Sequence, residues 1–168
     1  HITVFGVADI TPPDAEITIG KNSFKSFLNT VTFGLFFKST QTVTVTASDA
    51  GSGLKTVEYL LSETAFESKD AITGDWTALE LENGTASFSI APKQKAFVYV
   101  RVTDESGNIA VINSEGVVVY TDAEARRDSV TYVMGNSAEA YLPIDRNDNR
   151  ISAVYNGTQK LTENDDYT

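Results

Sequence analysis

The segment TVTVTASD, residues 42–49, and the segment AFVYVRVTD, residues 96–104, place small or branched apolar residues at every second position. Successive side chains of a β-strand point to opposite faces of a sheet, so this alternation predicts two strands, each with one buried face. Threonine and valine favour strands, and turn residues recur at short intervals along the chain. No stretch of a dozen residues carries a helical pattern. The sequence therefore predicts an all-β sandwich.

The same two segments echo each other with identical spacing. The matched residues are Val43, Val45, Ala47, Asp49 and Leu54 in the first segment and Val98, Val100, Val102, Asp104 and Ile109 in the second. In a Greek-key sandwich, two such strands would be strands B and F, which lead to strands C and G. We therefore expect the turns that begin at Asp49 and Asp104 to share one pole of the sandwich.

Two Asn-Gly pairs mark further turns, because both residues tolerate the positive φ angles of a tight hairpin. Asn83-Gly84 is predicted to join strands at residues 77–82 and 85–90, and Asn156-Gly157 to join residues 150–155 and 158–161. Each pair also begins an Asn-Gly-Thr glycosylation sequon. The turn explains both pairs sufficiently, and we favour it.

Composition excludes several classes of function. The 168 residues carry 23 acidic and 13 basic side chains, a net charge of −10, which argues against a surface that follows nucleic-acid phosphates. The chain has no cysteine, and its single histidine is His1. Disulfides, thiolate metal sites, a Ser-His-Asp triad and multi-histidine metal sites therefore have no residues to form them.

One stretch is unusually apolar for so acidic a chain: SFLNTVTFGLFFKS, residues 26–39. It is too short, and too polar at Asn29, Thr30 and Thr32, to cross a bilayer, which needs roughly 20 mostly apolar residues. We expect no membrane insertion. We expect its aromatic residues to pack in the sandwich core or cover one end of it. The alternative is an exposed patch for a neighbouring module or a ligand.

The order of strands and breaks suggests four segments. Residues 1–13 are expected to be the tail strand of a preceding module and a linker, and residues 14–122 the β-sandwich, which already accounts for about seven strands. Residues 123–127 are expected to be a second linker. Residues 128–168 would form a shorter, incomplete β-module.

Three segments of the predicted sandwich resemble a known family of modules. The segments SDAGSGLKTVEYLLS (48–62), GDWTAL (74–79) and YVRVTDESGNIA (99–110) resemble the bacterial immunoglobulin-like (Ig-like) modules of large surface-anchored and secreted proteins of Gram-positive bacteria. That resemblance covers most of residues 14–122. It implies an Ig-like Greek-key β-sandwich, an extracellular location at the cell surface or cell wall or in secreted form, and no family catalytic residues.

The tail is similar to the first half of the X2 family of Ig-like modules, which are associated with carbohydrate-active and cellulosomal proteins. Asn156-Gly157, Leu161 and the closing residues Asp166, Tyr167 and Thr168 carry this match. The remaining strands of an X2 module are missing from the sequence, so we expect residues 128–168 to be an incomplete X2-like module.

Two groups of residues are candidates for binding. Asp49 and Asp104 could meet at one pole and, with Asn108, Glu105 or backbone carbonyls, offer oxygen ligands to calcium, a hard cation that takes six to eight oxygens. The alternative is that these residues form turns and cap backbone amides, which we favour. Calcium is the one cofactor we consider, and no other is expected.

Aromatic residues form the second group. Trp76, Tyr59 and Tyr155 could stack on the apolar faces of sugar rings, although a lone Trp in a sandwich more often packs in the core or at an edge. The acidic residues Glu58, Glu63, Glu80 and Glu82 lie on or beside predicted strands, where solvated faces are expected rather than the paired carboxylates of a glycoside hydrolase.

These patterns favour a non-enzymatic spacer or adhesion module of a modular bacterial protein. Its expected partners are neighbouring modules of the same polypeptide, with host or cell-wall glycan or protein as further candidates. The rival hypothesis is a carbohydrate-binding module that anchors a neighbouring enzyme to polysaccharide. A clustered, exposed Trp/Tyr face would favour the rival, and burial of Trp76 would favour the spacer.

Overall fold

The structure is a computed structural model that describes residues 8–127, 129, 131 and 141–163. The chain divides into two compact units, His1–Tyr120 and Thr121–Thr168. The first unit therefore includes residues 8–13, the described part of the segment expected to precede the sandwich. Among the described residues, every regular element is a β-strand apart from one 3₁₀ turn at Lys69–Ala71. In the described part of the chain, no helix is long and apolar enough to cross a membrane.

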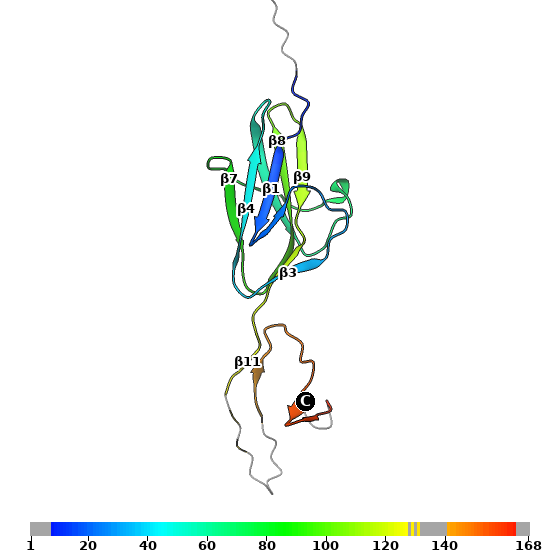
Figure 1. Cartoon of the computed structure of the whole chain (residues 1–168), viewed down its shortest axis with the longest axis vertical. Helices are drawn as coiled ribbons and strands as arrows, with labels where there is room; N and C mark the ends of the chain where they lie inside the picture. The colour runs from blue at the N-terminus through cyan, green and yellow to red at the C-terminus, as the bar shows by residue number, and fades with distance from the viewer. Residues whose placement is uncertain (1–7, 128, 130, 132–140, 164–168) are drawn as a thin grey trace, which may run out of the picture. The chain divides into compact units, whose positions relative to one another are not determined.

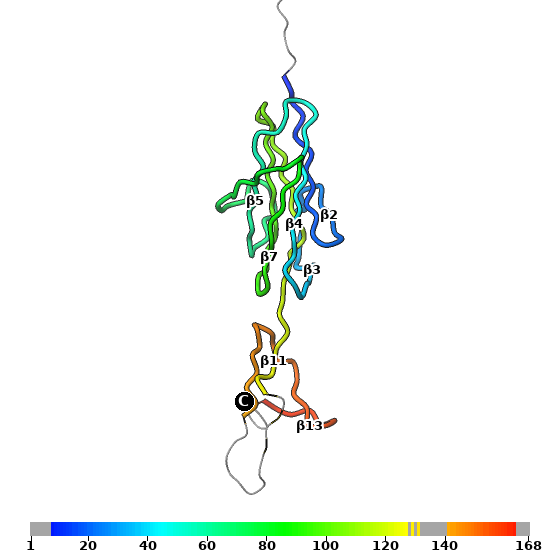
Figure 2. Tube along the Cα trace, turned by 90° about the vertical axis from the view of Figure 1, so that its left-hand side faces the viewer, coloured from blue at the N-terminus to red at the C-terminus, as the bar shows by residue number. Residues whose placement is uncertain are grey.

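Two sheets form the first unit (Figure 1). The first sheet has the order β2 (Asn22–Phe24), β1 (Asp14–Ile19), β4 (Gln41–Ser48) and β7 (Thr85–Ile90). The second has the order β3 (Phe33–Phe37), β10 (Gly116–Val119), β8 (Gln94–Asp104), β5 (Leu54–Ser62) and β6 (Thr77–Ala78), with β9 (Ile109–Asn113) also paired to β8. All pairs are antiparallel except β3 with β10. Figure 2 shows β2 of the first sheet and β5 of the second on opposite sides of the unit.

This strand order confirms the predicted all-β Greek-key sandwich. The two echoed segments become β4 and β8, which lie in different sheets, as strands B and F do in an immunoglobulin-like fold. Their alternating residues meet between the sheets. The fully buried side chains of the core include Ile17, Ile19, Val43, Val45, Val98, Val100, Val102, Val117 and Val119.

A second apolar cluster covers the outer face of the second sheet. Its buried members are Leu60, Phe97 and Tyr99, which alternate with the core residues of β5 and β8. The partly buried side chains packed against them come from β3 and from the loops before β3 and after β5: Phe27, Val31, Phe33, Ala65, Phe66, Ile72 and Trp76. Residues 96–100 of β8 are therefore buried on both faces, unlike a strand with one solvated side.

The apolar stretch at residues 26–39 supplies part of this cover. Phe27 and Phe33 pack on the outer cluster, whereas Leu35 and Phe37 pack on the main core. Only Phe36 turns outward among the aromatic residues of β3, with 61% of its surface exposed. Leu35 is thus buried, and the other apolar side chains of the stretch except Phe36 are half-buried, while its polar residues stay exposed.

The two predicted hairpins differ from expectation in detail. Asn83 and Gly84 have φ angles of 52° and 78°, as the predicted turn requires, and Glu82 and Thr85 close it with backbone hydrogen bonds of 2.8 and 3.1 Å. The strand expected before this turn is wrong: only Thr77–Ala78 forms a strand, β6, and it pairs with β5 in the other sheet. The chain crosses between the sheets here, so only the last residue before the turn can pair with β7.

The second unit contains two short antiparallel pairs. β11 (Glu124–Ala125) pairs with β12 (Ile144–Asp145), and β13 (Tyr155–Asn156) pairs with β14 (Gln159–Lys160). The expected linker at residues 123–127 thus contributes β11. Asn156 lies opposite Gln159, so the hairpin loop begins one residue later than predicted, at Gly157.

Burial distinguishes the second unit from the first. None of its described residues, 121–127, 129, 131 and 141–163, is buried. The exposed large apolar side chains in this range are Tyr141, Leu142, Ile144, Ile151 and Tyr155. Residues 1–7 of the expected tail strand, and Asp166, Tyr167 and Thr168 of the X2 resemblance, lie outside the described residues.

Candidate functional site

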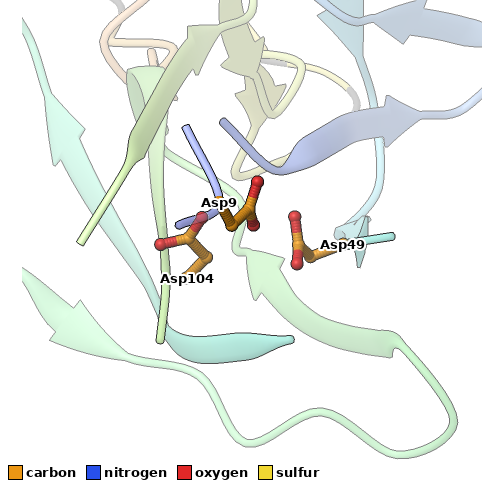
Figure 3. Close-up of side chains that lie close together, drawn as sticks. All are labelled: Asp9, Asp49 and Asp104. Atoms are coloured by element: carbon orange, nitrogen blue, oxygen red, sulfur yellow. The ribbon is translucent and has the colours of Figure 1, made fainter. Parts of the chain in front are cut away.

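Three segments meet at one pole of the first unit. The turn after β4 carries Asp49, the end of β8 carries Asp104, and the leading segment, residues 8–13, carries Asp9. Each of these residues places one carboxylate oxygen within 4.8 Å of the others (Figure 3). The structure therefore brings Asp49 and Asp104 together, as the echo predicts, and adds Asp9, which the sequence reasoning missed.

Backbone N–H groups hold two of these carboxylates. Asp49 accepts hydrogen bonds from Gly51 N at 3.0 Å and Gly53 N at 2.6 Å, both through Oδ2, so it shapes its own turn. Asp9 accepts from Thr11 N at 3.0 Å and from Ser52 N at 2.9 Å. The bond to Ser52 crosses from the leading segment to the turn after β4.

Asp104 is held mainly by Asn108. Its side chain is fully buried, and it accepts hydrogen bonds from Asn108 N at 2.8 Å and Asn108 Nδ2 at 2.7 Å. The same Nδ2 donates to Asp9 O at 3.1 Å and Thr11 O at 3.4 Å. Asn108 thus connects the end of β8 to the backbone of the leading segment. We call Asp9, Ser52, Asp104 and Asn108 the pole clamp.

The two turns are also tied to each other. Glu105 N donates to Gly53 O at 2.9 Å, and Ser106 N donates to Ser52 Oγ at 3.2 Å. The turns after β4 and β8 therefore form one connected platform, on which the leading segment lies.

Hydrogen bonding keeps the pole acidic. The N–H groups of Thr11 and Ser52 lower the pKa of Asp9 below its usual value of 3.8. Burial raises the pKa of Asp104, but the bonds from the Asn108 side chain and from the Asn108 and Gly107 amides outweigh it, so the pKa is lowered overall. Asp9 and Asp104 are therefore both ionised at neutral pH, and their N–H donors stabilise the ionised carboxylates.

The side chains at this pole include the residues predicted to bind calcium. Over residues 8–127, 129, 131 and 141–163, this is the one group of three or more acidic or histidine side chains close enough to share a cation. Asn108, predicted as an oxygen ligand, instead turns its amide nitrogen toward Asp104 and the leading segment. A nitrogen donor holds carboxylates but cannot ligate calcium. The carboxylate oxygens that lie together are those of the three aspartates, and calcium binding stays a prediction.

The structure does not bring together Tyr59 and Trp76 of the predicted aromatic platform. Tyr59 faces the main core, where its ring stacks on Phe88 with centroids 4.0 Å apart. Trp76 packs on the outer cluster, on the other face of the same sheet. Tyr155 is 59% exposed and belongs to the second unit.

One surface of Trp76 is already occupied. The Arg101 guanidinium lies 4.5 Å from the centre of the Trp76 ring, and Glu58 holds the guanidinium with contacts of 2.8 and 2.9 Å. A sugar that stacked on this face would have to displace Arg101, whose ion pair is itself partly buried. The geometry therefore favours a packing role for Trp76.

Sequence comparison does not assign the chain to a family. No protein-family model matches the chain, and no curated protein is significantly similar to it in sequence. The likeness to bacterial Ig-like and X2 modules thus remains a resemblance of short motifs. The functional proposal therefore depends on the geometry of the pole and on the path of the chain.

Proposed function

We propose that this chain is a non-catalytic Ig-like spacer or adhesion module of a large modular bacterial surface or secreted protein. The observation that carries the proposal is the pole clamp, which ties the leading segment to the sandwich at two points, Asp9 to Ser52 and Asn108 to Asp9 and Thr11. A spacer needs its neighbours held in a fixed direction, and a segment bonded at several points has little freedom to swing.

The path of the chain supports the same role. The leading segment is bonded to Asn108, which also holds Asp104, the last residue of β8, whereas β10 ends at Val119 opposite Gln94, the first residue of β8. The eleven residues of β8 separate these two points by roughly 35 Å, at about 3.3 Å per residue. The chain therefore enters and leaves the first unit at opposite ends, as in a module that spans distance (Figure 1).

The direction of the leading segment can be measured. We would attach spin labels to Ala8→Cys and Ser89→Cys, since both side chains are exposed and the chain has no cysteine of its own. A narrow distance distribution is expected, and Asn108→Ala should broaden it. Glu105→Ala, an exposed side chain on the same turn, is the matched control and should leave it narrow. A distribution that is equally broad with and without Asn108 would remove the support for a fixed spacer.

The alternative functions need a separate screen. A glycan array and polysaccharide pull-down on the full chain, run with calcium and with chelator, tests the carbohydrate-binding module. Specific binding that Trp76→Ala abolishes would overturn the spacer proposal. A calcium-dependent rise in melting temperature that Asp49→Asn removes would show that the three aspartates of the pole bind calcium.

A further inference from the structure

We infer that the first unit resists stretching along its strands, and that β10 carries the applied force and yields first. This inference rests on the proposed spacer role, because a module placed between others in a surface protein is pulled through its two ends. It goes beyond that role by naming the strand that sets the mechanical strength.

The loading geometry follows from the chain path. β1 begins at Asp14, opposite Ser48, and runs away from the pole clamp, while β10 runs toward the end where the chain leaves. A pull on the two ends therefore acts along both strands, in opposite directions. Under such shear, all hydrogen bonds of a ladder share the force, whereas a sideways pull breaks them one after another.

β10 is held on both of its edges. It pairs in parallel with β3 and antiparallel with β8, and its ends are fixed by Gly116 N to Thr32 O at 2.9 Å and Tyr120 N to Phe37 O at 2.9 Å. Lys93 N also donates to Val119 O at 2.7 Å. Val117 and Val119 are fully buried in the core. The strand can leave only if both ladders and this packing are lost together.

β1 is also a central strand, but it is held by more residues. It forms six register pairs with β4 and three with β2, whereas β10 forms four with β3 and three with β8. Four of the β10 pairs are parallel, the slightly weaker arrangement per residue. Since the same force passes through both strands, β10 should slide first.

A second point of attachment lies directly behind β10. Ser114 N donates to Val98 O at 2.9 Å, and Ser114 Oγ accepts from Val98 N at 3.2 Å and donates to Glu115 O at 2.7 Å. Ser114 is fully buried, and β9 continues the pairing to β8 beyond it. Force that frees β10 is thus passed to this junction, and the unit should open in order from β10 to β9.

Single-molecule force spectroscopy on the full chain tests the inference through the direction of pulling. Handles on Ala8→Cys and Ala123→Cys load the strands in shear, whereas handles on Ser39→Cys and Ala123→Cys pull apart the adjacent ends of β3 and β10. The introduced thiols are the only attachment points, because the chain has no cysteine. The unfolding force should be several-fold higher in the first geometry. Equal forces, or a lower force in shear, would overturn the inference.

A pair of core variants tests whether β10 is the strand that yields. Val117 on β10 and Ile90 on β7 are both fully buried, but β7 lies at a sheet edge outside the path of the force. Ile90→Ala removes more side-chain volume and should be the less stable variant in urea. Val117→Ala should nevertheless lower the shear unfolding force more, because forced unfolding is governed by the barrier along the loaded strand. If Ile90→Ala lowered the unfolding force more than Val117→Ala, in the same order as their stabilities in urea, the mechanical strength would come from the fold as a whole and the role of β10 would be overturned.

These measurements are separate from those that test the spacer role. A fixed leading segment in the spin-label experiment, together with no difference between the pulling directions, would leave a spacer that bears no special load. A mobile leading segment together with a higher unfolding force in shear would support the load-bearing role of β10 and remove the support for a fixed spacer.

Discussion

Tyr99 and Asn113 lie opposite each other on β8 and β9, and each holds one of the two loops that cover the second sheet. The Tyr99 hydroxyl accepts a hydrogen bond from Phe66 N at 2.8 Å. Asn113 accepts from Leu28 N at 2.6 Å and donates to Leu28 O at 3.2 Å. Both side chains are fully buried. Their hydrogen bonds therefore supply partners to backbone groups of irregular loops, which would otherwise be shielded from water without a partner.

Removing the Asn113 amide should therefore be costly. Asn113→Ala leaves both backbone groups of Leu28 without their partner, and we expect a loss of about 2–4 kcal/mol in urea unfolding. Tyr99→Phe removes one acceptor and should cost about 1–2 kcal/mol. A change below about 0.5 kcal/mol for Asn113→Ala, the size typical of surface substitutions, would show that the loop at residues 25–32 does not need this anchor.

Two phenylalanines of β3 lie in different surroundings, one packed against another ring and one exposed. Phe33 lies 4.6 Å from Phe97, centroid to centroid, whereas Phe36 is 61% exposed. We expect Phe33→Ala to lower the free energy of unfolding by about 2–4 kcal/mol, and Phe36→Ala to change it by about 0.5 kcal/mol or less. Equal losses for the two variants in denaturant titrations would contradict the assigned faces of β3.

Gly116 is needed at the start of β10 because the space beside it is filled. A Cβ there would lie 2.5 Å from Phe33 Cδ1 and 2.9 Å from Phe97 Cε1. Gly116→Ala should thus destabilise by about 1–3 kcal/mol, as overpacking does. Gly34→Ala is the control, since its Cβ would meet only the flexible end of the Glu115 side chain. Thermal unfolding of the two variants should show a clear loss for Gly116→Ala alone.

Much of the fold was open to sequence reasoning, because local alternation reports which face of a strand is buried. The pattern placed β4 and β8 in a common core and their turns at one pole. It could not show that β8 is buried on both faces, since the second cover comes from loops far away in the sequence. It also missed the parallel contact of β3 with β10, which depends on where an irregular segment returns to the sheet.

The candidate site was predictable in part for the same reason. Asp49 and Asp104 follow matched strands, so their meeting follows from topology. Asp9 carries no such signal, because the sequence predicts a linker for its segment and its bond to Ser52 joins residues 43 positions apart. Packing of Trp76 was one of the two predicted alternatives, but its contact with Arg101 of β8 was not predicted, because Arg101 lies 25 positions further along the sequence.

The pole clamp should make stability depend on pH in a defined direction. Hydrogen bonds from Asn108 help to lower the pKa of Asp104 in the folded state, against the effect of burial. A carboxyl whose folded pKa lies below its unfolded value of about 3.8 stabilises the fold above that value. This stabilisation is lost as the pH falls through the folded pKa, because the proton then binds both states. The melting temperature should therefore begin to drop below about pH 5 and keep falling until the pH lies below the folded pKa of Asp104.

Asn108→Ala should reduce both the stability at neutral pH and the steepness of this drop. Without the Asn108 side chain, burial weighs more heavily and the folded pKa of Asp104 moves upward, so less stability remains to be lost on acidification. A gentler slope should persist, since the pKa values of Asp9 and Glu16 are also lowered, by the Thr11 amide and by Ser23 respectively. Glu105→Ala is the control for a change on the same turn. If Asn108→Ala and Glu105→Ala gave the same pH profile in thermal melts, Asn108 would not be the residue that keeps Asp104 ionised.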